Sequence, residues 1–181
     1  MPAESLSSLA VLVTLLTGAN LLPGEIVQFD RTAISSGELW RLWTGQFCHW
    51  SVPHLVGNLA GLAALGMIAG RGLWRWLVGL LLAAPLLSLL LLGLVPDLQY
   101  YRGLSGLLAV LVIGTAVEGG RSGGIIALAW AAKLLFDAVS GAHSPLLPDG
   151  IATAWQAHWA GMGLGIMMAT YFHHFPNRTS A

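Results

Sequence analysis

The organisation of this chain follows from residues 100–106, which read Tyr-Tyr-Arg-Gly-Leu-Ser-Gly. An apolar run from Leu107 to Val117 comes next and ends at Glu118. The run predicts a helix over residues 104–117, of ~14 residues and therefore ~21 Å long at ~1.5 Å per residue. Ser105 then sits at the start of a short apolar helix, flanked closely by glycines.

The composition is that of a membrane protein. Of the 181 residues, 56% are hydrophobic and 9% are charged, and the mean hydropathy is +0.73. Soluble domains carry about 25% charged residues. The formal net charge is zero, and no basic patch suggests a nucleic-acid partner. The single cysteine, Cys48, excludes an internal disulfide.

Apolar segments predict an all-α bundle of six membrane-spanning helices in a single domain over residues 1–181. No Lys or Arg precedes the first segment, so it reads as a retained span, although Thr17-Gly18-Ala19 leaves cleavage as a signal peptide open. The Trp-rich residues 25–50 suit an interfacial loop. The expected spans are residues 6–22, 53–69, 73–94, 104–117, 124–139 and 155–172.

The helix that begins near Ser105 is too short to cross the ~30 Å hydrocarbon core of a bilayer. If Glu118 and Arg121 mark one surface of the membrane, Ser105 lies below the opposite surface. The loop before Ser105 must then be buried in protein or line a water-filled cavity. A hydroxyl in that place is a candidate nucleophile. The alternative is a small residue at a helix–helix contact, where Ser and Gly are common.

The distribution of arginines gives an orientation. With six spans both termini share one side, which also carries Arg71, Arg75, Arg121 and Arg178, and the other side has three arginines. The small excess favours cytoplasmic termini under the positive-inside rule. Ser105 and the loop over residues 25–50 then face the outside.

The last span contains a stripe of small residues beside a histidine. Ala157, Gly161 and Gly165 recur every four residues, so a neighbouring helix can approach closely. His158 adjoins the stripe near the outer end, and an ionisable residue in a span suggests a functional site. It is a candidate base for Ser105, because imidazole titrates near neutrality. The alternative is a histidine bonded to a loop carbonyl at the interface.

The second span carries His54 and Asn58, one turn apart on one face. Both side chains can donate hydrogen bonds, and two donors converging near a nucleophile suit a tetrahedral oxyanion. The alternative reading is hydrogen bonding between helices.

The remaining patterns predict no metal or other cofactor. The histidine spacings do not match His-Glu-x-x-His, and no carboxylate cluster accompanies them. Residues 118–124 are glycine-rich but lack the Gly-Lys-Ser/Thr of a phosphate loop, and they predict a turn. Lys133 and Asp137, four residues apart in the fifth span, are expected to pair.

Four motifs in this order resemble those of the rhomboid family of intramembrane serine proteases, and they cover about residues 38–170. The small chain and the Lys-and-acid pattern at Lys133 and Asp137 are also similar to the rhombosortase branch. The matching residues are Trp40-Arg41, His54-x-x-x-Asn58, Gly103-Leu104-Ser105-Gly106, and Ala157-His158 with Gly161 and Gly165.

The resemblance implies a Ser105–His158 dyad without a third acid, and an oxyanion held by the Ser105 amide, His54 and Asn58. It implies that Gly103, Gly106, Gly161 and Gly165 pack around the site. The implied substrate is a transmembrane segment of another protein, cut near the outer face. For rhombosortases it is a C-terminal tail with Gly-Gly, an apolar span and basic residues. The implied location is the bacterial inner membrane, with the site open to the periplasm.

Two rival functions remain open on the sequence: a catalytically inactive member of the fold that binds membrane clients, and a small-solute channel. One position departs from the family. Many rhomboids have a tyrosine four residues after the serine that packs on the catalytic histidine, and here the residue is Ala109. Another group, such as a tryptophan, is then needed to fix the imidazole. The oligomeric state is not indicated by the sequence.

Overall fold

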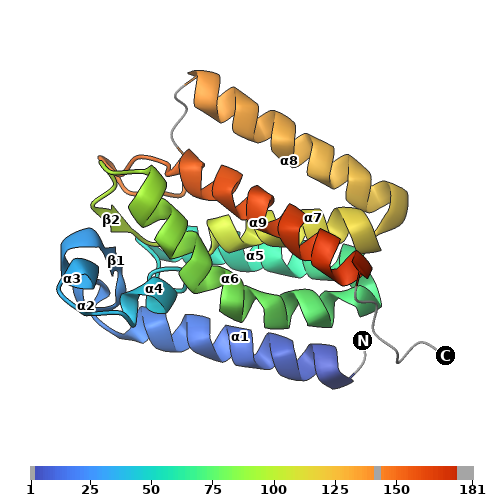
Figure 1. Cartoon of the computed structure of the whole chain (residues 1–181), viewed down its shortest axis with the longest axis horizontal. Helices are drawn as coiled ribbons and strands as arrows, with labels where there is room; N and C mark the ends of the chain where they lie inside the picture. Colours follow the sequence, from blue (N-terminus) through green and yellow to red (C-terminus); the bar gives the residue numbers. More distant parts are fainter. Residues whose placement is uncertain (1–2, 141–143, 175–181) are drawn as a thin grey trace.

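The computed structural model describes residues 3–140 and 144–174, and this part of the chain is mostly helical. Figure 1 shows long helices packed side by side, with short elements gathered at the end away from the two termini. The long helices are α1 (Ala3–Leu21), α5 (Val52–Ala69), α6 (Leu73–Leu94), α7 (Ser105–Glu118), α8 (Gly120–Ser140) and α9 (Trp155–His174). The short elements are α2 (Gly24–Val27), β1 (Phe29–Asp30), α3 (Arg31–Ser35), α4 (Arg41–Thr44), η1 (Gly70–Gly72) and β2 (Tyr100–Tyr101).

The central helix is α7, which has 14 residues and begins at Ser105, one residue later than expected. It contacts α5, α6, α8 and α9, and residues 106–112 are all buried. A helix that is apolar on all sides is stable only when surrounded by others. Its uniform hydrophobicity therefore places the Ser105 end of the helix in the interior of the bundle.

The turn expected over the glycine-rich residues 118–124 is present but shorter than predicted. After a single residue, Gly119, the chain enters α8 at Gly120. The glycines also permit a close approach, because a Cβ atom on Gly123 would lie 1.9 Å from the Thr115 carbonyl oxygen. The glycines after Gly119 belong to α8, where they let its first turn pack on the last turn of α7.

The small-residue stripe of α9 packs on α7, as expected. A Cβ atom on Gly161 would lie 2.0 Å from the carbonyl oxygen of Gly106, and one on Gly165 would lie 3.0 Å from that of Val110. Both distances are below an ordinary carbon–oxygen contact of about 3.3 Å. The two helices therefore lie backbone to backbone, which only glycine allows at Gly161.

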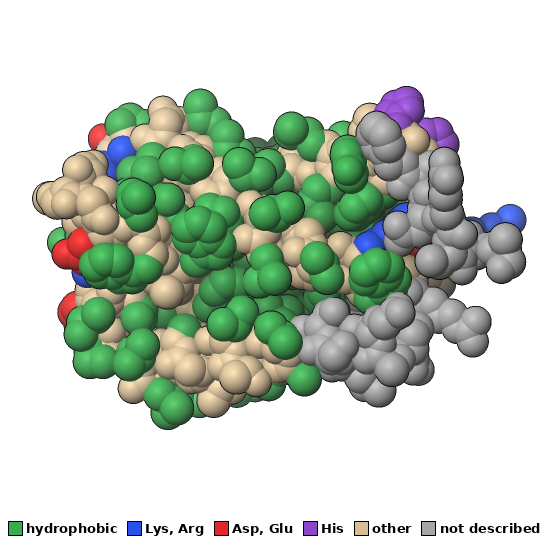
Figure 2. Space-filling model, turned by 60° about the horizontal axis from the view of Figure 1, so that its bottom comes forward, with side chains coloured by type: hydrophobic (Ala, Val, Ile, Leu, Met, Phe, Trp, Pro, Cys, Tyr) green, Lys and Arg blue, Asp and Glu red, His purple; other side chains and the backbone are tan. Residues whose placement is uncertain are grey.

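The outer surface of the described part is apolar between its two ends. Among the described residues, three helices are long and apolar enough to cross a membrane, judged by length and composition: Val52–Ala69, Trp74–Leu94 and Gly120–Ser140. The apolar helices Ala10–Leu21 and Ser105–Glu118 are shorter. Figure 2 shows hydrophobic side chains across the middle of one face and charged side chains toward the ends. Arg178, one of the arginines used for the orientation, lies outside the described residues.

The loop after α1 folds over the Ser105 end of the bundle and is anchored to α6. The Trp43 indole N–H donates to the carbonyl oxygen of Leu81 at 3.0 Å. That oxygen has no helical donor, because the residue four positions later is Pro85, which lacks an N–H. The Arg31 guanidinium similarly donates to the carbonyl oxygens of Leu91 and Val95 near the end of α6.

The same loop also joins the segment that precedes Ser105. Strand β1 pairs antiparallel with β2, with Phe29 opposite Tyr101. The Gly103 amide donates to the Gly45 carbonyl oxygen at 3.2 Å. The segment that carries Ser105 is thus held by backbone hydrogen bonds before α7 begins.

Candidate active site

The backbone before Ser105 requires glycine. Gly103 has a φ angle of +144°, a conformation that side chains with a Cβ rarely adopt. A Cβ atom there would also lie 2.9 Å from Cε1 of the His54 ring. Gly103 therefore lets the chain turn into α7 while the His54 ring lies directly against the turn.

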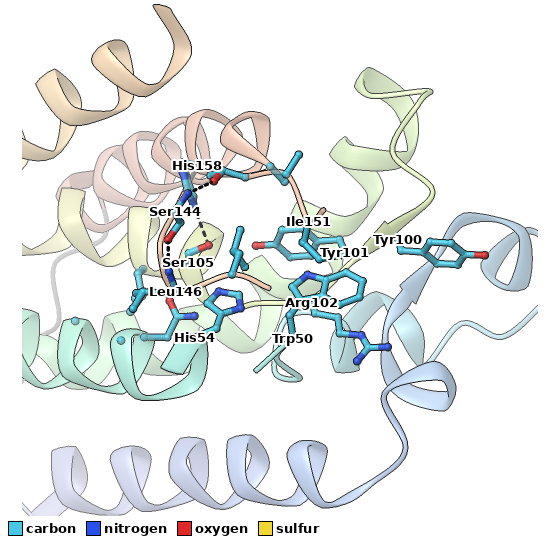
Figure 3. A pocket seen from close by; sticks show the side chains of 18 of the residues that line it. Trp50, His54, Tyr100, Tyr101, Arg102, Ser105, Ser144, Leu146, Ile151 and His158 are labelled. Atoms are coloured by element: carbon cyan, nitrogen blue, oxygen red, sulfur yellow. Dashed lines mark hydrogen bonds between the residues drawn. The ribbon is translucent and has the colours of Figure 1, made fainter. Parts of the chain in front are cut away.

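The structure brings Ser105 and His158 together from α7 and α9. Ser105 Oγ lies 2.9 Å from His158 Nε2, which is hydrogen-bonding distance (Figure 3). The imidazole is only 8% exposed. The close packing of Gly161 on Gly106 sets this distance, because it fixes the separation of the two helices one turn away.

The other ring nitrogen of His158 is Nδ1. Nδ1 is buried and makes no hydrogen bond to any residue that the structure describes. The carboxylate of Asp137, on α8, forms an ion pair with Lys133 instead, as the spacing of the two residues predicted. Among the residues that the structure describes, no carboxylate is therefore hydrogen-bonded to the His158 imidazole.

A cavity of about 450 Å³ opens beside this pair. Its wall on α5 includes His54 and Asn58, which are both buried. His54 Nδ1 and Asn58 Nδ2 have no hydrogen-bond partner among the described residues. A buried polar group without a partner is costly, and these two side chains line a space where an oxygen atom of a ligand could accept from them.

Residues 144–154, between α8 and α9, line the cavity from another side. Their position is fixed by Ser51, the N-cap of α5, whose hydroxyl donates to the Leu146 carbonyl oxygen at 2.9 Å. The same hydroxyl oxygen accepts from the His54 amide at 3.2 Å. The Leu146 side chain also packs over Gly57, where a Cβ atom would lie 2.5 Å from it.

Two aromatic residues that were not proposed as site residues from the sequence stand next to the pair. The Trp130 ring, on α8, meets the His158 ring edge to face, with centroids 6.3 Å apart. Tyr101, at the end of β2, is 4% exposed, and its hydroxyl lies near the first turn of α7. Trp130 precedes Lys133 by three residues and so shares its helix face. The sequence signal for it was the expectation that a group such as a tryptophan fixes the imidazole in place of a tyrosine at Ala109.

His49, which was not predicted, is a neighbour of His54. Its ring meets the His54 ring at 5.0 Å between centroids, and Asn20 of α1 lies 3.3 Å from its Nδ1 atom. Burial, with a smaller effect of nearby His54, lowers the pKa of His49 to about 3. A neutral His49 thus connects the first helix of the bundle to His54.

Comparison with known proteins assigns the family. The family model described as Rhomboid domain matches residues 36–175, which is most of the chain. The chain belongs to the rhomboid family. No curated protein matches it. Rhomboids are generally serine proteases, and the matched range together with the apolar helices indicates an integral membrane protein.

The rhomboid match includes every motif noted in the sequence. Within it, Trp40-Arg41 has a structural place in the loop after α1 rather than at the Ser105–His158 pair. Arg41 is buried, and it donates to the carbonyl oxygens of Glu25 and Gln28 and to the carboxylate of Glu38. In this rhomboid the motif therefore shapes the loop that joins the segment before Ser105. Among the described residues, no group of three or more His, Cys, Asp or Glu side chains is arranged to hold a metal ion.

Proposed function

We propose that this rhomboid is an active intramembrane serine endopeptidase that cleaves transmembrane segments of other proteins. The observation that supports the proposal most directly is the 2.9 Å separation of Ser105 Oγ and His158 Nε2 at the edge of a cavity. A serine is a weak nucleophile unless a base accepts its proton. An inactive relative or a solute channel would not need this pairing.

The catalytic groups of the proposed reaction are all side chains and backbone of this chain, and water is the second reactant. Ser105 Oγ attacks the carbonyl carbon of the scissile peptide bond, and His158 Nε2 takes the hydroxyl proton. The electron pair of the carbonyl bond moves to its oxygen, where the Ser105 amide, His54 and Asn58 donate hydrogen bonds. The tetrahedral intermediate expels the amine, which receives the proton from His158. Water then hydrolyses the acyl-enzyme.

The Ser105 amide is available for this role because of its place in α7. The first backbone N–H groups of a helix have no intrahelical acceptor. The positive end of the helix dipole also favours negative charge there. His54 and Asn58 support the same assignment, since both side chains line the cavity beside Ser105 and can donate hydrogen bonds.

We further propose six spans, formed by α1 and α5–α9, with the cavity open to the outer side. Because α7 has 14 residues, it covers ~21 Å of a ~30 Å hydrocarbon core. Its Ser105 end would then lie below the outer surface. In a bacterial inner membrane this side is the periplasm, and a substrate helix would be cut near its periplasmic end.

The proposed branch is that of the rhombosortases, on the grounds of the small chain and the Lys133–Asp137 pair. The substrate would then be a C-terminal tail of Gly-Gly, an apolar span and basic residues. A reporter with this tail should be cleaved after co-expression, whereas the same reporter with Leu-Leu in place of Gly-Gly should stay intact. Equal cleavage of both reporters, or of neither by an active enzyme, would exclude this specificity.

Labelling with a fluorophosphonate tests the protease proposal itself. The probe bonds to an activated serine with loss of fluoride, so it should label the wild type in detergent or membranes. Ser105→Ala should abolish labelling, and His158→Ala should reduce it at least 100-fold, because each partner is ineffective alone. A folded wild type that resists the probe would overturn the proposal in favour of an inactive relative.

A further inference from the structure

The only lysine of the chain lines the cavity beside the Ser105–His158 pair. Lys133 is on α8, three residues after Trp130, whose ring meets the His158 ring. Lys133 and Ser105 are equally far in sequence from Gly119, the residue that joins α7 to α8. At ~1.5 Å per residue, both lie ~20 Å from that connection along their helices. Lys133 is therefore part of the cavity wall at about the depth of the nucleophile, where an ionisable residue in a span suggests a function.

The ammonium group of Lys133 is held by an ion pair and is still accessible. Nζ pairs with the carboxylate of Asp137, one turn later on α8. The Asp137 side chain is 12% exposed, whereas the Lys133 side chain is 61% exposed. An ammonium group has three N–H donors, of which this ion pair uses one. The remaining donors can bind a ligand in the cavity.

The second cation of the cavity is held by other side chains. Among the described residues that line the cavity, Arg102 and Lys133 carry a formal charge when the histidines are neutral. The Arg102 guanidinium lies over the Trp50 ring, 4.3 Å from its centroid, and donates to Gln28 Oε1 at 2.9 Å. It also forms an ion pair with Glu25, and its side chain is 13% exposed. Lys133 is therefore the more accessible of the two cations.

The ion pair with Asp137 determines which ligand suits Lys133. The carboxylate offsets the charge of the ammonium, so the pair does not require an anion, and its remaining donors suit neutral acceptors such as backbone carbonyl oxygens. A transmembrane helix offers these oxygens only where it opens, because inside the helix they accept from its own N–H groups. Opening the helix in hydrocarbon leaves carbonyl oxygens without donors, which is energetically costly.

We infer that Lys133 is a substrate-binding residue: its ammonium donates to backbone carbonyl oxygens of the substrate where the helix unwinds beside the scissile bond, and Asp137 holds the ammonium in place. This inference rests on the proposed function and specifies the form in which the substrate is bound. The donors of Lys133 offset part of the cost of unwinding. They therefore favour a segment that opens easily, such as one with Gly-Gly, over a segment that stays helical.

The first test measures binding without cleavage, in full-length protein that carries Ser105→Ala. The probes are dye-labelled synthetic peptides with a span of Leu and Ala followed by arginines, and binding is followed by fluorescence anisotropy in detergent. One peptide has Gly-Gly at the start of the span and the other has Leu-Leu, and neither has an acidic residue. Lys133→Met is combined with Asp137→Asn, so that no unpaired carboxylate remains, and Asp137→Asn alone is the control. We expect the Kd of the Gly-Gly peptide to be roughly tenfold higher in the combined variant than in the control, the effect of one hydrogen bond from a charged donor.

The control separates the two possible roles of Lys133. If the lysine only pairs with Asp137, removing either partner has the same effect, so equal Kd values in the control and the combined variant would overturn the inference. Folded protein that binds neither peptide would overturn it as well. The Kd of the Leu-Leu peptide should not depend on Lys133. If the dependence on Lys133 appears only when an Asp follows Gly-Gly in the peptide, the ligand is a carboxylate and the assignment to backbone carbonyl oxygens is wrong.

The second test uses turnover and separates this inference from the proposed function. For the Gly-Gly peptide, the combined variant in the Ser105 background should have a KM roughly tenfold above that of Asp137→Asn, with a smaller change in kcat, because the hydrogen bond is already made when the substrate binds. Lys133→Arg keeps the charge and the donors and should restore most of the affinity. A loss confined to kcat would refute a binding role. If the wild type resists the fluorophosphonate, the protease proposal fails, while the binding test still decides the role of Lys133.

Discussion

The close contact between α7 and α9 predicts that Gly161→Ala lowers the reaction rate by separating the two helices. The added Cβ atom would lie 2.0 Å from the Gly106 carbonyl oxygen, whereas carbon and oxygen approach to about 3.3 Å. The helices must then separate by about 1.3 Å at this point. If that movement reaches the site one turn away, the 2.9 Å distance between Ser105 and His158 grows to about 4 Å, beyond hydrogen-bonding range. A misplacement of about 1 Å can cost roughly 100-fold in rate.

The rate of fluorophosphonate labelling per folded molecule measures this effect, with the melting temperature as a check on folding. The matched control is Gly163→Ala, two residues along the same helix, where a new Cβ atom meets nothing within 4 Å. Gly163→Ala should keep the wild-type labelling rate and gain stability, by up to about 1 kcal/mol from helix propensity. If Gly161→Ala folds and labels as fast as Gly163→Ala, the close contact does not set the geometry of the pair.

Three further substitutions probe other parts of the structure. Asn58→Ala should lower kcat roughly tenfold to 100-fold with little change in KM, because one of three oxyanion donors is lost. Unchanged turnover together with a large loss of melting temperature would show instead that Asn58 has a structural role. Trp43→Phe removes the donor to the Leu81 carbonyl and should cost about 1 kcal/mol, seen as a melting temperature lower by about 2–4 °C. His49, whose pKa burial lowers to about 3, binds fewer protons when folded than when unfolded. The contribution of His49 to the free energy of unfolding is therefore complete above about pH 6.5. It decreases as the pH is lowered, by about 2 kcal/mol at pH 5. His49→Phe should flatten the decline of melting temperature between pH 7 and pH 5, and an unchanged slope would contradict the assignment.

The long helices could be predicted because apolar runs and their breakers set their bounds. Residues 53–69 and 73–94 were expected as spans, and the structure has helices over Val52–Ala69 and Leu73–Leu94. The start of α8 was misplaced because a run of glycines is compatible with both a turn and a close helix contact. The short elements between α1 and α5 were not predicted, since they are held by contacts to α6 that are distant in sequence.

In the site too, residues that stand in a local sequence pattern could be predicted, whereas residues placed by contacts distant in sequence could not. Ser105 and His158 could be proposed because each stands in a recognisable run of small residues, and the resemblance to rhomboids supplied their pairing. Tyr101 and His49 were missed for a physical reason. Their positions come from a two-residue strand and from a ring contact, and neither produces a periodic pattern that a sequence displays.

The aromatic ring that packs on the His158 imidazole comes from α8, a helix with few buried residues. Ala109, the position where many rhomboids place a tyrosine, has only a methyl group, which is fully buried against α9 near Gly161. The aromatic ring next to His158 is instead that of Trp130 on α8. Of the residues in α8, only Gly123 and Leu134 are buried, and Figure 1 shows the end of this helix that lies away from α7 standing apart from the other helices. A ring carried by α7 would keep the same relation to Ser105 however α8 moved, whereas here the orientation of His158 depends on where α8 lies.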